Sequence, residues 1–546
     1  MKLTKIKSYL IALKLEILFF IIFVLYRLPQ LGFDNINIDA PVWKTRTFEF
    51  ASAFFSLNFD KTDVTYHPGV TLMWLSAVGV KIYNLFAYAY YGNLDLSTIR
   101  DYVGLDFTQK LMLVIVYALT LSITLHYLKK LNGNLFTFLF FFLLTFEPYF
   151  IGLTRVLHTD GMVTLFLFAS YITLYYSLTK NSRKSFVLSA FFAALSILTK
   201  SNSLIFIAYI FIFLILFNLK GTKNLFIVIK KSLKLYVLWG IIILAFFTLI
   251  WPAMWVIPIQ TIQKYIYGIT GVGLEEHSQE WFGVWVKDPG YLFYLVVYFI
   301  RSTPYFLILS TSGILLFVYS IFKYKKVDKL YLGSLLFVIF YTFILSISDK
   351  KLGRYILPVF PFMGLFAIYY FTQILNYFKL KTKNRKLLAF LFSFIFIILS
   401  FIQTYKIFPD YLMYFSPIIG GYEVGKNIEE LKWPIGYSTL ATYLNGLEGS
   451  KDRYVLIRYG YIYNPWNISK KTGTLSQKTD KDPGVYFILE KLSDWRYVRG
   501  KGVKLIKILK VGGYDTFWIY EILGDYDVTK DYKFMYPKGS KLDPKF

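Results

Sequence analysis

The chain has 546 residues, of which 56% are hydrophobic and 21% are aromatic. This composition exceeds that of soluble globular domains and indicates an integral membrane protein. The formal net charge of +27 does not indicate a nucleic-acid partner, because the basic residues form short clusters between apolar runs. The lack of cysteine excludes disulfides and thiolate chemistry.

Apolar runs along the chain predict membrane-spanning helices. About 20 residues are needed to cross the hydrocarbon core of a bilayer, and about eleven segments approach that length. They are residues 8–28, 108–128, 134–152, 160–179, 185–199, 202–219, 233–252, 303–322, 329–348, 355–375 and 387–407. The sequence therefore predicts an all-α polytopic protein of the cell membrane, embedded in the lipid bilayer.

Clusters of Lys and Arg predict the orientation of these spans, because such clusters mark cytoplasmic connections. They fall on alternate connections if the apolar segment 69–90 lies along the outer interface and does not cross. The N-terminus is then cytoplasmic, and loops 29–107 and 252–290 lie outside. We expect residues 1–407 to form the membrane domain and residues 408–546 to form an extracytoplasmic domain.

The C-terminal stretch has a different pattern from the spans. It contains the runs "RYVLIRYGYIY", "GVYFILE", "VKLIKIL" and "DTFWIYEIL", separated by Gly, Pro and Asp clusters. Short runs rich in β-branched and aromatic residues between turn formers are typical of strands. We predict a small α/β or β-rich domain.

Ionisable residues gather at the outer ends of the predicted spans. Placing a charge in or near a membrane costs free energy, so each of these residues is expected to have a structural or functional role. They include Asp39, Glu147, Arg155, Asp160, Lys200 and Arg354. Cations at one membrane face can hold a phosphate, and a carboxylate can accept a proton from a hydroxyl. A lipid-phosphate substrate would need both.

Structural explanations compete with these functional ones. Asp39 and Asp160 could cap helices, while Lys200 and Arg354 could extend their charged ends to lipid headgroups. His67, beside a proline, could be a turn residue.

Two further readings concern metal binding and transport. Glu275, Glu276 and His277 could hold a metal ion, but a solvated loop is the favoured explanation for them. A transporter is disfavoured, because the span centres are apolar and no symmetric pair of broken helices is evident.

Seven segments, in order, resemble a known family. They are "NIDAPVWKTRTFEF", "YHPGVTLMWLSAVG", "FEPYFIGLTRVLHTDG", "LTKSNSLIFI", "WFGVWVKDPGYLFYLVVYFIRSTP", "SDKKLGRYILPVFP" and "PDYLMYFSPIIGG". They are similar to motifs of the GT-C superfold membrane glycosyltransferases. Within that superfold they resemble family 39, which includes protein O-mannosyltransferases and the aminoarabinose transferases that act on lipid A.

The resemblance implies roles for individual acids. Asp39 matches the catalytic base, and Asp160 matches the second acidic position. Ala40 stands where the family usually has Glu, and Glu147 stands where it usually has Asp. The resemblance also implies that Lys200, Arg354 and Arg155 bind the donor phosphate.

His67, Glu147 and His277 are expected to support the site. The residues identify no cofactor, and a divalent metal ion stays an open question.

The function implied is an inverting glycosyltransferase on the extracytoplasmic face. It would move a sugar from a polyprenyl-phosphate donor to a hydroxyl of a protein, glycolipid or polysaccharide acceptor. Two alternatives stay open at this point. One is a transporter or flippase, and the other is a non-catalytic polyprenyl-phosphate-binding member, for which Ala40 is the argument.

Overall fold

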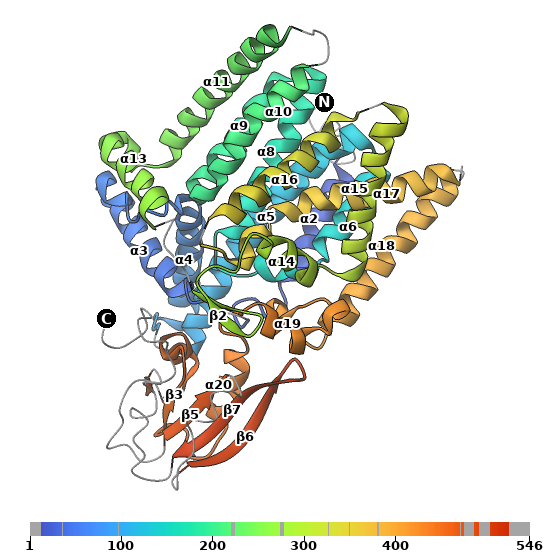
Figure 1. Ribbon diagram of the computed structural model, residues 1–546. Helices are drawn as coiled ribbons and strands as arrows, with labels where there is room; N and C mark the ends of the chain where they lie inside the picture. The colour runs from blue at the N-terminus through green and yellow to red at the C-terminus, as the bar shows by residue number, and fades with distance from the viewer. Residues whose placement is uncertain are drawn as a thin grey trace, which may run out of the picture.

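The protein is a bundle of long helices with a small sheet at one end (Figure 1). The computed structural model describes residues 13–522, except 35, 97, 220–223, 273–277, 326, 349, 379–381, 470, 474–484 and 491–502. Within that part of the chain, nine helices are long and apolar enough to cross a membrane. The predicted fold class, a polytopic helical membrane protein with a small strand-containing C-terminal region, is confirmed.

Helices α2 to α18 make up the bundle. They are α2 (Lys14–Arg27), α3 (Ala40–Phe55), α4 (Val70–Tyr91), α5 (Ile99–Asn132), α6 (Asn134–Thr145), α7 (Pro148–Leu153), α8 (Asp160–Lys180), α9 (Arg183–Thr199), α10 (Leu204–Asn218), α11 (Leu225–Ile250), α12 (Ala253–Val256), α13 (Pro258–Tyr267), α14 (Phe293–Arg301), α15 (Pro304–Tyr324), α16 (Lys329–Ile347), α17 (Val359–Tyr377) and α18 (Thr382–Thr404).

Two differences from the predicted spans and loops are the largest. The predicted span 134–152 is divided into α6 and α7, because Pro148 has no amide hydrogen and begins a new helix. The predicted loop 29–107 is largely helical, since it contains α3, α4 and the start of α5. Helix α4 is itself long and apolar enough to cross, so its expected interfacial position stays a prediction, as does the orientation of the termini.

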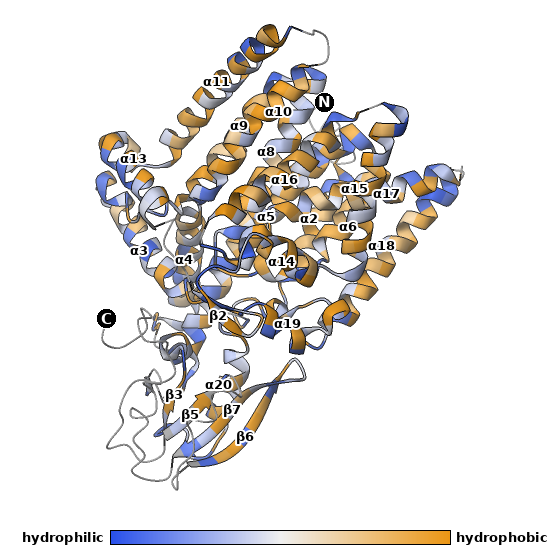
Figure 2. Ribbon diagram, viewed as in Figure 1, coloured by the Kyte–Doolittle hydropathy of each residue, from blue (hydrophilic) through white to orange (hydrophobic). Residues whose placement is uncertain are grey.

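Burial separates the inner helices from the outer ones. In the most apolar stretch of α8, 83% of the residues are buried, whereas the value is 17% for α11 and 22% for α15. Apolar residues predominate along the long helices, and hydrophilic residues gather near several of their ends (Figure 2). An exposed apolar surface of this kind suits contact with lipid. The start of α8 is therefore held in the packed interior of the bundle.

The C-terminal region contains a five-stranded mixed sheet in the order β4-β3-β5-β7-β6. Its strands are β3 (Tyr454–Leu456), β4 (Thr472–Gly473), β5 (Val485–Leu489), β6 (Val503–Val511) and β7 (Tyr514–Ile522). Strand β3 is parallel to β4 and β5, and β7 is antiparallel to β5 and β6. Helices α19 (Tyr422–Ile428), α20 (Tyr437–Asn445) and α21 (Gly460–Tyr463) accompany it.

A hairpin in the predicted loop 252–290 connects the sheet region to the bundle. Its strands are β1 (Gln279–Trp281) and β2 (Val284–Val286), and Phe282 N donates to Ile428 O over 3.1 Å. Arg301, at the end of α14, contacts Glu429 over 2.8 Å. These contacts fix the segment after α19 against the end of the bundle where the candidate site lies.

Candidate functional site

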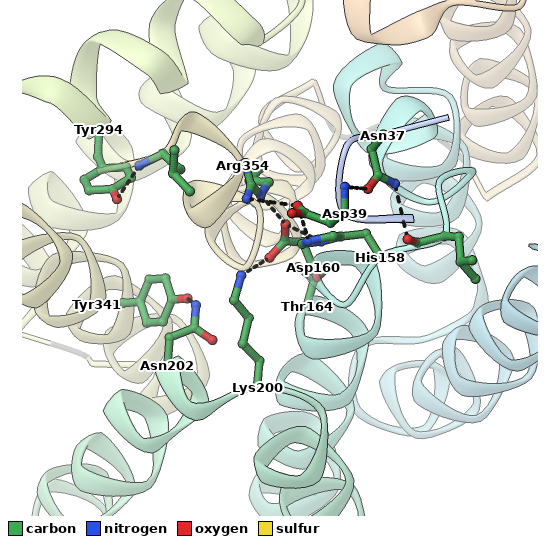
Figure 3. Close-up of polar contacts among 12 residues, drawn as sticks. Asn37, Asp39, His158, Asp160, Thr164, Lys200, Asn202, Tyr294, Tyr341 and Arg354 are labelled. Atoms are coloured by element: carbon green, nitrogen blue, oxygen red, sulfur yellow. Dashed lines mark hydrogen bonds and ion pairs between the residues drawn. The ribbon is translucent and has the colours of Figure 1, made fainter. Parts of the chain in front are cut away.

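Four charged residues singled out in the sequence come together in the structure (Figure 3). Asp39 precedes α3, Asp160 begins α8, Lys200 follows α9, and Arg354 lies in the 3-10 turn Gly353–Ile356. Lys200 Nζ lies 2.6 Å from Asp160 Oδ1, and Arg354 Nε lies 3.1 Å from Asp160 Oδ2. Arg354 also lies 3.6 Å from Asp39 Oδ2. We call these four residues and His158 the charged cluster.

His158 lies between the two carboxylates. Its Nδ1 is 2.9 Å from Asp160 Oδ2, and its Nε2 is 3.3 Å from Asp39 Oδ2. Within the described chain, Asp160 Oδ2, His158 Nδ1 and Arg354 Nε are buried without a well-aligned hydrogen bond, despite these short distances. Buried polar atoms with unused hydrogen-bonding capacity are uncommon and call for an explanation. A bound polar ligand would supply one.

Exposure distinguishes the two carboxylates. The side chain of Asp39 is 38% exposed, whereas that of Asp160 is 4% exposed. Burial alone would raise the pKa of Asp39, but contact with His158 and the charges of Arg354 and Lys200 outweigh that effect and hold its pKa well below the usual range. Asp39 is therefore an accessible carboxylate at neutral pH, whereas Asp160 is an internal anchor for cations.

Backbone contacts set the position of Asp39. Asn37 Oδ1 accepts a hydrogen bond from Asp39 N at 3.0 Å, and Asn37 Nδ2 donates to Leu157 O at 3.2 Å. The chain before α3 is thus attached to the chain before α8. Although Asp39 occupies the N-cap position of α3, its side chain caps no amide. The capping explanation considered from the sequence does not account for this residue.

The segment that contains His67 is fixed beside Lys200. Gly69 N donates to Thr199 O at 3.3 Å, one residue before Lys200. Gly69 has φ +52°, and a Cβ there would lie 2.2 Å from the Trp43 ring, so both the backbone and the packing require glycine. No local sequence pattern connects the segment of His67 with Trp43 and Lys200.

His67 lies in surroundings with an excess of positive charge. Burial, followed by the charges of Lys200, Lys350 and Arg46, lowers its pKa to about 4, and the opposing charge is that of Asp39. His67 is therefore neutral at pH 7. Its surroundings would favour an anion.

The other predicted site residues lie elsewhere. Glu147 accepts hydrogen bonds from Thr303 N at 2.8 Å and Thr303 Oγ1 at 2.7 Å, which secures the start of α15. Arg155 contacts Asp34 at 3.0 Å and donates to two backbone carbonyl oxygens. Each of its three guanidinium nitrogens already has a partner, so we do not propose Arg155 as a phosphate ligand. His277 falls outside the described residues, with Glu275 and Glu276.

No group of three His, Cys, Asp or Glu side chains that could hold a metal ion occurs in the part of the chain that the structure describes. Within the cluster, each carboxylate already faces a cation. The structure therefore identifies no candidate metal ligands among those residues.

Trp433 completes the site and was not identified from the sequence. Its ring centroid lies 5.0 Å from that of His158, and the Arg354 guanidinium lies 4.7 Å from it. A cation over an aromatic face is attracted to it. Trp433 follows α19 in the C-terminal region, and only the folding of that region onto the bundle brings it here. His158, by contrast, could have been suspected from its place two residues before Asp160.

A second set of buried charges lies beside Asp410. Lys110 contacts Asp34 and Asp106, each at 2.7 Å, and Asp34 also contacts Arg155. Asp410 accepts from Gly436 N at 3.4 Å. Burial, then the charge of Asp34, raises the pKa of Asp410 to about 7. Asp410 therefore binds a proton in the folded chain at pH values where an unfolded chain, with a pKa of about 3.9, has lost it.

The pH dependence of stability tests whether Asp410 keeps a proton in the folded chain. Asp410 stabilises the fold below about pH 4, and that contribution is lost as pH rises through about 7. We expect Asp410→Asn, which imitates the protonated acid, to raise Tm clearly at pH 8 and to raise it less at pH 5, where only part of this stability has been lost. Thermal unfolding at the two pH values measures this, with the exposed Asp452→Asn as control. An equal shift at both pH values would contradict the assignment.

Comparisons with known proteins give structural similarity alone. No family model matches the chain, and no curated protein matches it. ArnT from Cupriavidus metallidurans, bound to undecaprenyl phosphate, is similar with a TM-score of 0.48 and 12% identity, over 92% of this chain and 97% of that chain. The apo oligosaccharyltransferase of Archaeoglobus fulgidus is similar with a TM-score of 0.45 and 10% identity, over 84% of this chain and 64% of that chain. Membership of family 39 stays a prediction.

Proposed function

We propose that this chain is an inverting glycosyltransferase of the GT-C type. It moves a sugar from a polyprenyl-phosphate donor to an acceptor hydroxyl on the extracytoplasmic face. The observation that carries the proposal is the half-exposed, ionised Asp39 beside a cluster of cations. The seven ordered sequence motifs support the same class of enzyme.

One base suffices for this chemistry. Asp39 takes the proton of the acceptor hydroxyl as that oxygen attacks the anomeric carbon, and the bond from that carbon to the phosphate oxygen breaks with its electron pair leaving on the phosphate. A double displacement would need a second carboxylate as nucleophile. Asp160 is unsuited to that role, because its side chain is 4% exposed and contacts three other side chains. The sugar is therefore transferred with inversion.

The cations stabilise the leaving group. Arg354 and Lys200 can oppose the charge that develops on the phosphate, and such preorganised stabilisation is commonly the largest catalytic contribution. The contact of Arg354 with Asp39 is long, at 3.6 Å. A phosphate that draws Arg354 away raises the pKa of Asp39. Binding of the donor thus makes Asp39 a better base at the moment it is needed.

Turnover of a labelled donor tests the proposal. The protein is purified, placed in lipid nanodiscs, and incubated with radiolabelled polyprenyl-phosphate mannose, glucose and aminoarabinose. We expect one donor to release free polyprenyl phosphate, slowly to water and faster with an acceptor. Binding of polyprenyl phosphate with no release from any donor would favour the non-catalytic member. Movement of intact donor across a vesicle membrane would favour a flippase.

A further inference from the structure

The C-terminal region contains a cavity of about 330 Å³ that is separate from the charged cluster. It lies between α19, the segment 430–435 and strand β7. Its volume is in the range of small-ligand sites. Nothing in the proposed transfer chemistry uses it directly.

The walls of this cavity suit a carbohydrate. Tyr422, Trp433 and Trp518 supply aromatic surface against which the apolar faces of sugar rings can pack. Four carboxylates and two cationic side chains supply the polar groups. Carboxylates accept hydrogen bonds from hydroxyl and amino groups, and their excess repels phosphates and uronic acids. The cavity therefore differs in charge from the surroundings of His67.

Trp433 links the cavity to the cluster. It also lines a smaller cavity of about 50 Å³ that reaches Arg354, and the two cavities share Glu430, Leu431, Trp433 and Ile435. Trp433 is 7% exposed, and its indole N–H has no hydrogen-bond partner within the described ranges. An unpaired buried N–H is costly unless a ligand accepts its hydrogen bond. A sugar hydroxyl in either cavity would do so.

We propose that this cavity binds the acceptor as a hydroxyl-rich glycan that is neutral or carries amino groups. The proposal rests on the proposed function, since it names the class of acceptor for that reaction. A glycan held between Tyr422 and Trp518 follows the shared wall toward Arg354. The C-terminal region then selects the acceptor.

Binding of defined trisaccharides to the full-length protein tests the inference. Chitotriose, mannotriose, the glucosamine trimer and trigalacturonate are titrated by saturation-transfer NMR and tryptophan fluorescence. We expect one of the first three to bind about tenfold or more tightly than trigalacturonate. Failure of all three to bind, or preference for the acidic trisaccharide, would overturn the proposal.

Two variants of α19 locate the binding. Asn427 is exposed and lines the cavity, whereas Val424, which is 44% exposed on the same helix, does not. Asn427→Trp should abolish saturable binding, and Val424→Trp should preserve it. Equal binding by both variants would place the glycan elsewhere and refute the site. Hydrolysis of the donor by the wild-type protein is measured in parallel, so that glycan binding and the proposed transfer can fail separately.

Discussion

Asp39→Asn is expected to lower the rate of sugar transfer by about 10²–10⁴-fold, the usual contribution of a general base. The amide has nearly the same shape as the carboxylate but cannot take the acceptor proton. Folding should be little affected, because the Asp39 side chain is 38% exposed and its contacts with His158 and Arg354 are long, at 3.3 and 3.6 Å. Donor turnover, donor binding and Tm are measured on the same preparation.

A matched control uses another acid of the same helix. Glu49 is exposed on α3, and Glu49→Gln should transfer sugar at the wild-type rate. A well-folded Asp39→Asn protein that transfers sugar at a near-normal rate would exclude Asp39 as the base.

The pH dependence of the transfer rate is a second test of Asp39 as the base. Since the pKa of Asp39 in the free protein lies well below its usual range, protonation of this group should not limit kcat/KM until the pH falls below about 3.9, the ordinary value for Asp. The rate falls with acid because the protonated form is no base.

Hydrophobic length made the bundle predictable from the sequence. The predicted span 160–179 corresponds to α8 (Asp160–Lys180). A helix must contain about 20 consecutive apolar residues to cross a membrane, and a run of that length can be recognised directly in the sequence. The break at Pro148 was equally visible in the sequence but was overridden by the apolar run around it. A proline without an amide hydrogen limits a helix even where hydropathy favours its continuation.

The site was predictable only in part, because the role of a charged side chain depends on which residues it contacts in the folded protein. Arg155 and Arg354 look alike in the sequence, as arginines near outer helix ends. Arg155 faces Asp34 and two carbonyl oxygens, whereas Arg354 faces Asp39 and Asp160. No local pattern distinguishes these outcomes.

Trp433 is a still clearer case of a residue that local sequence could not identify. It reaches His158 only because the hairpin and the end of α14 hold the segment after α19 in place.

Asp160→Asn should destabilise the protein strongly, unlike Asp39→Asn. Asp160 is 4% exposed and lies within 3.1 Å of Lys200, His158 and Arg354. Removing one partner of a buried ion pair costs about 3–5 kcal/mol, because the remaining charge is left uncompensated. We expect a clear fall in Tm together with loss of transfer, since His158 and Arg354 lose their anchor. Tm and donor turnover are compared with those of Asp39→Asn.

The double variant shows whether uncompensated charge is the cause. Lys200 is the nearest partner of Asp160, at 2.6 Å, and Met keeps much of the lysine chain length without its charge. If unpaired Lys200 accounts for the loss, Asp160→Asn combined with Lys200→Met is more stable than Asp160→Asn alone, although transfer stays low because the phosphate has lost a cation. If the double variant is less stable by the sum of the two single effects, the residues act independently. Packing around Asp160 would then stabilise the cluster, and packing rather than charge balance would hold Arg354 beside Asp39.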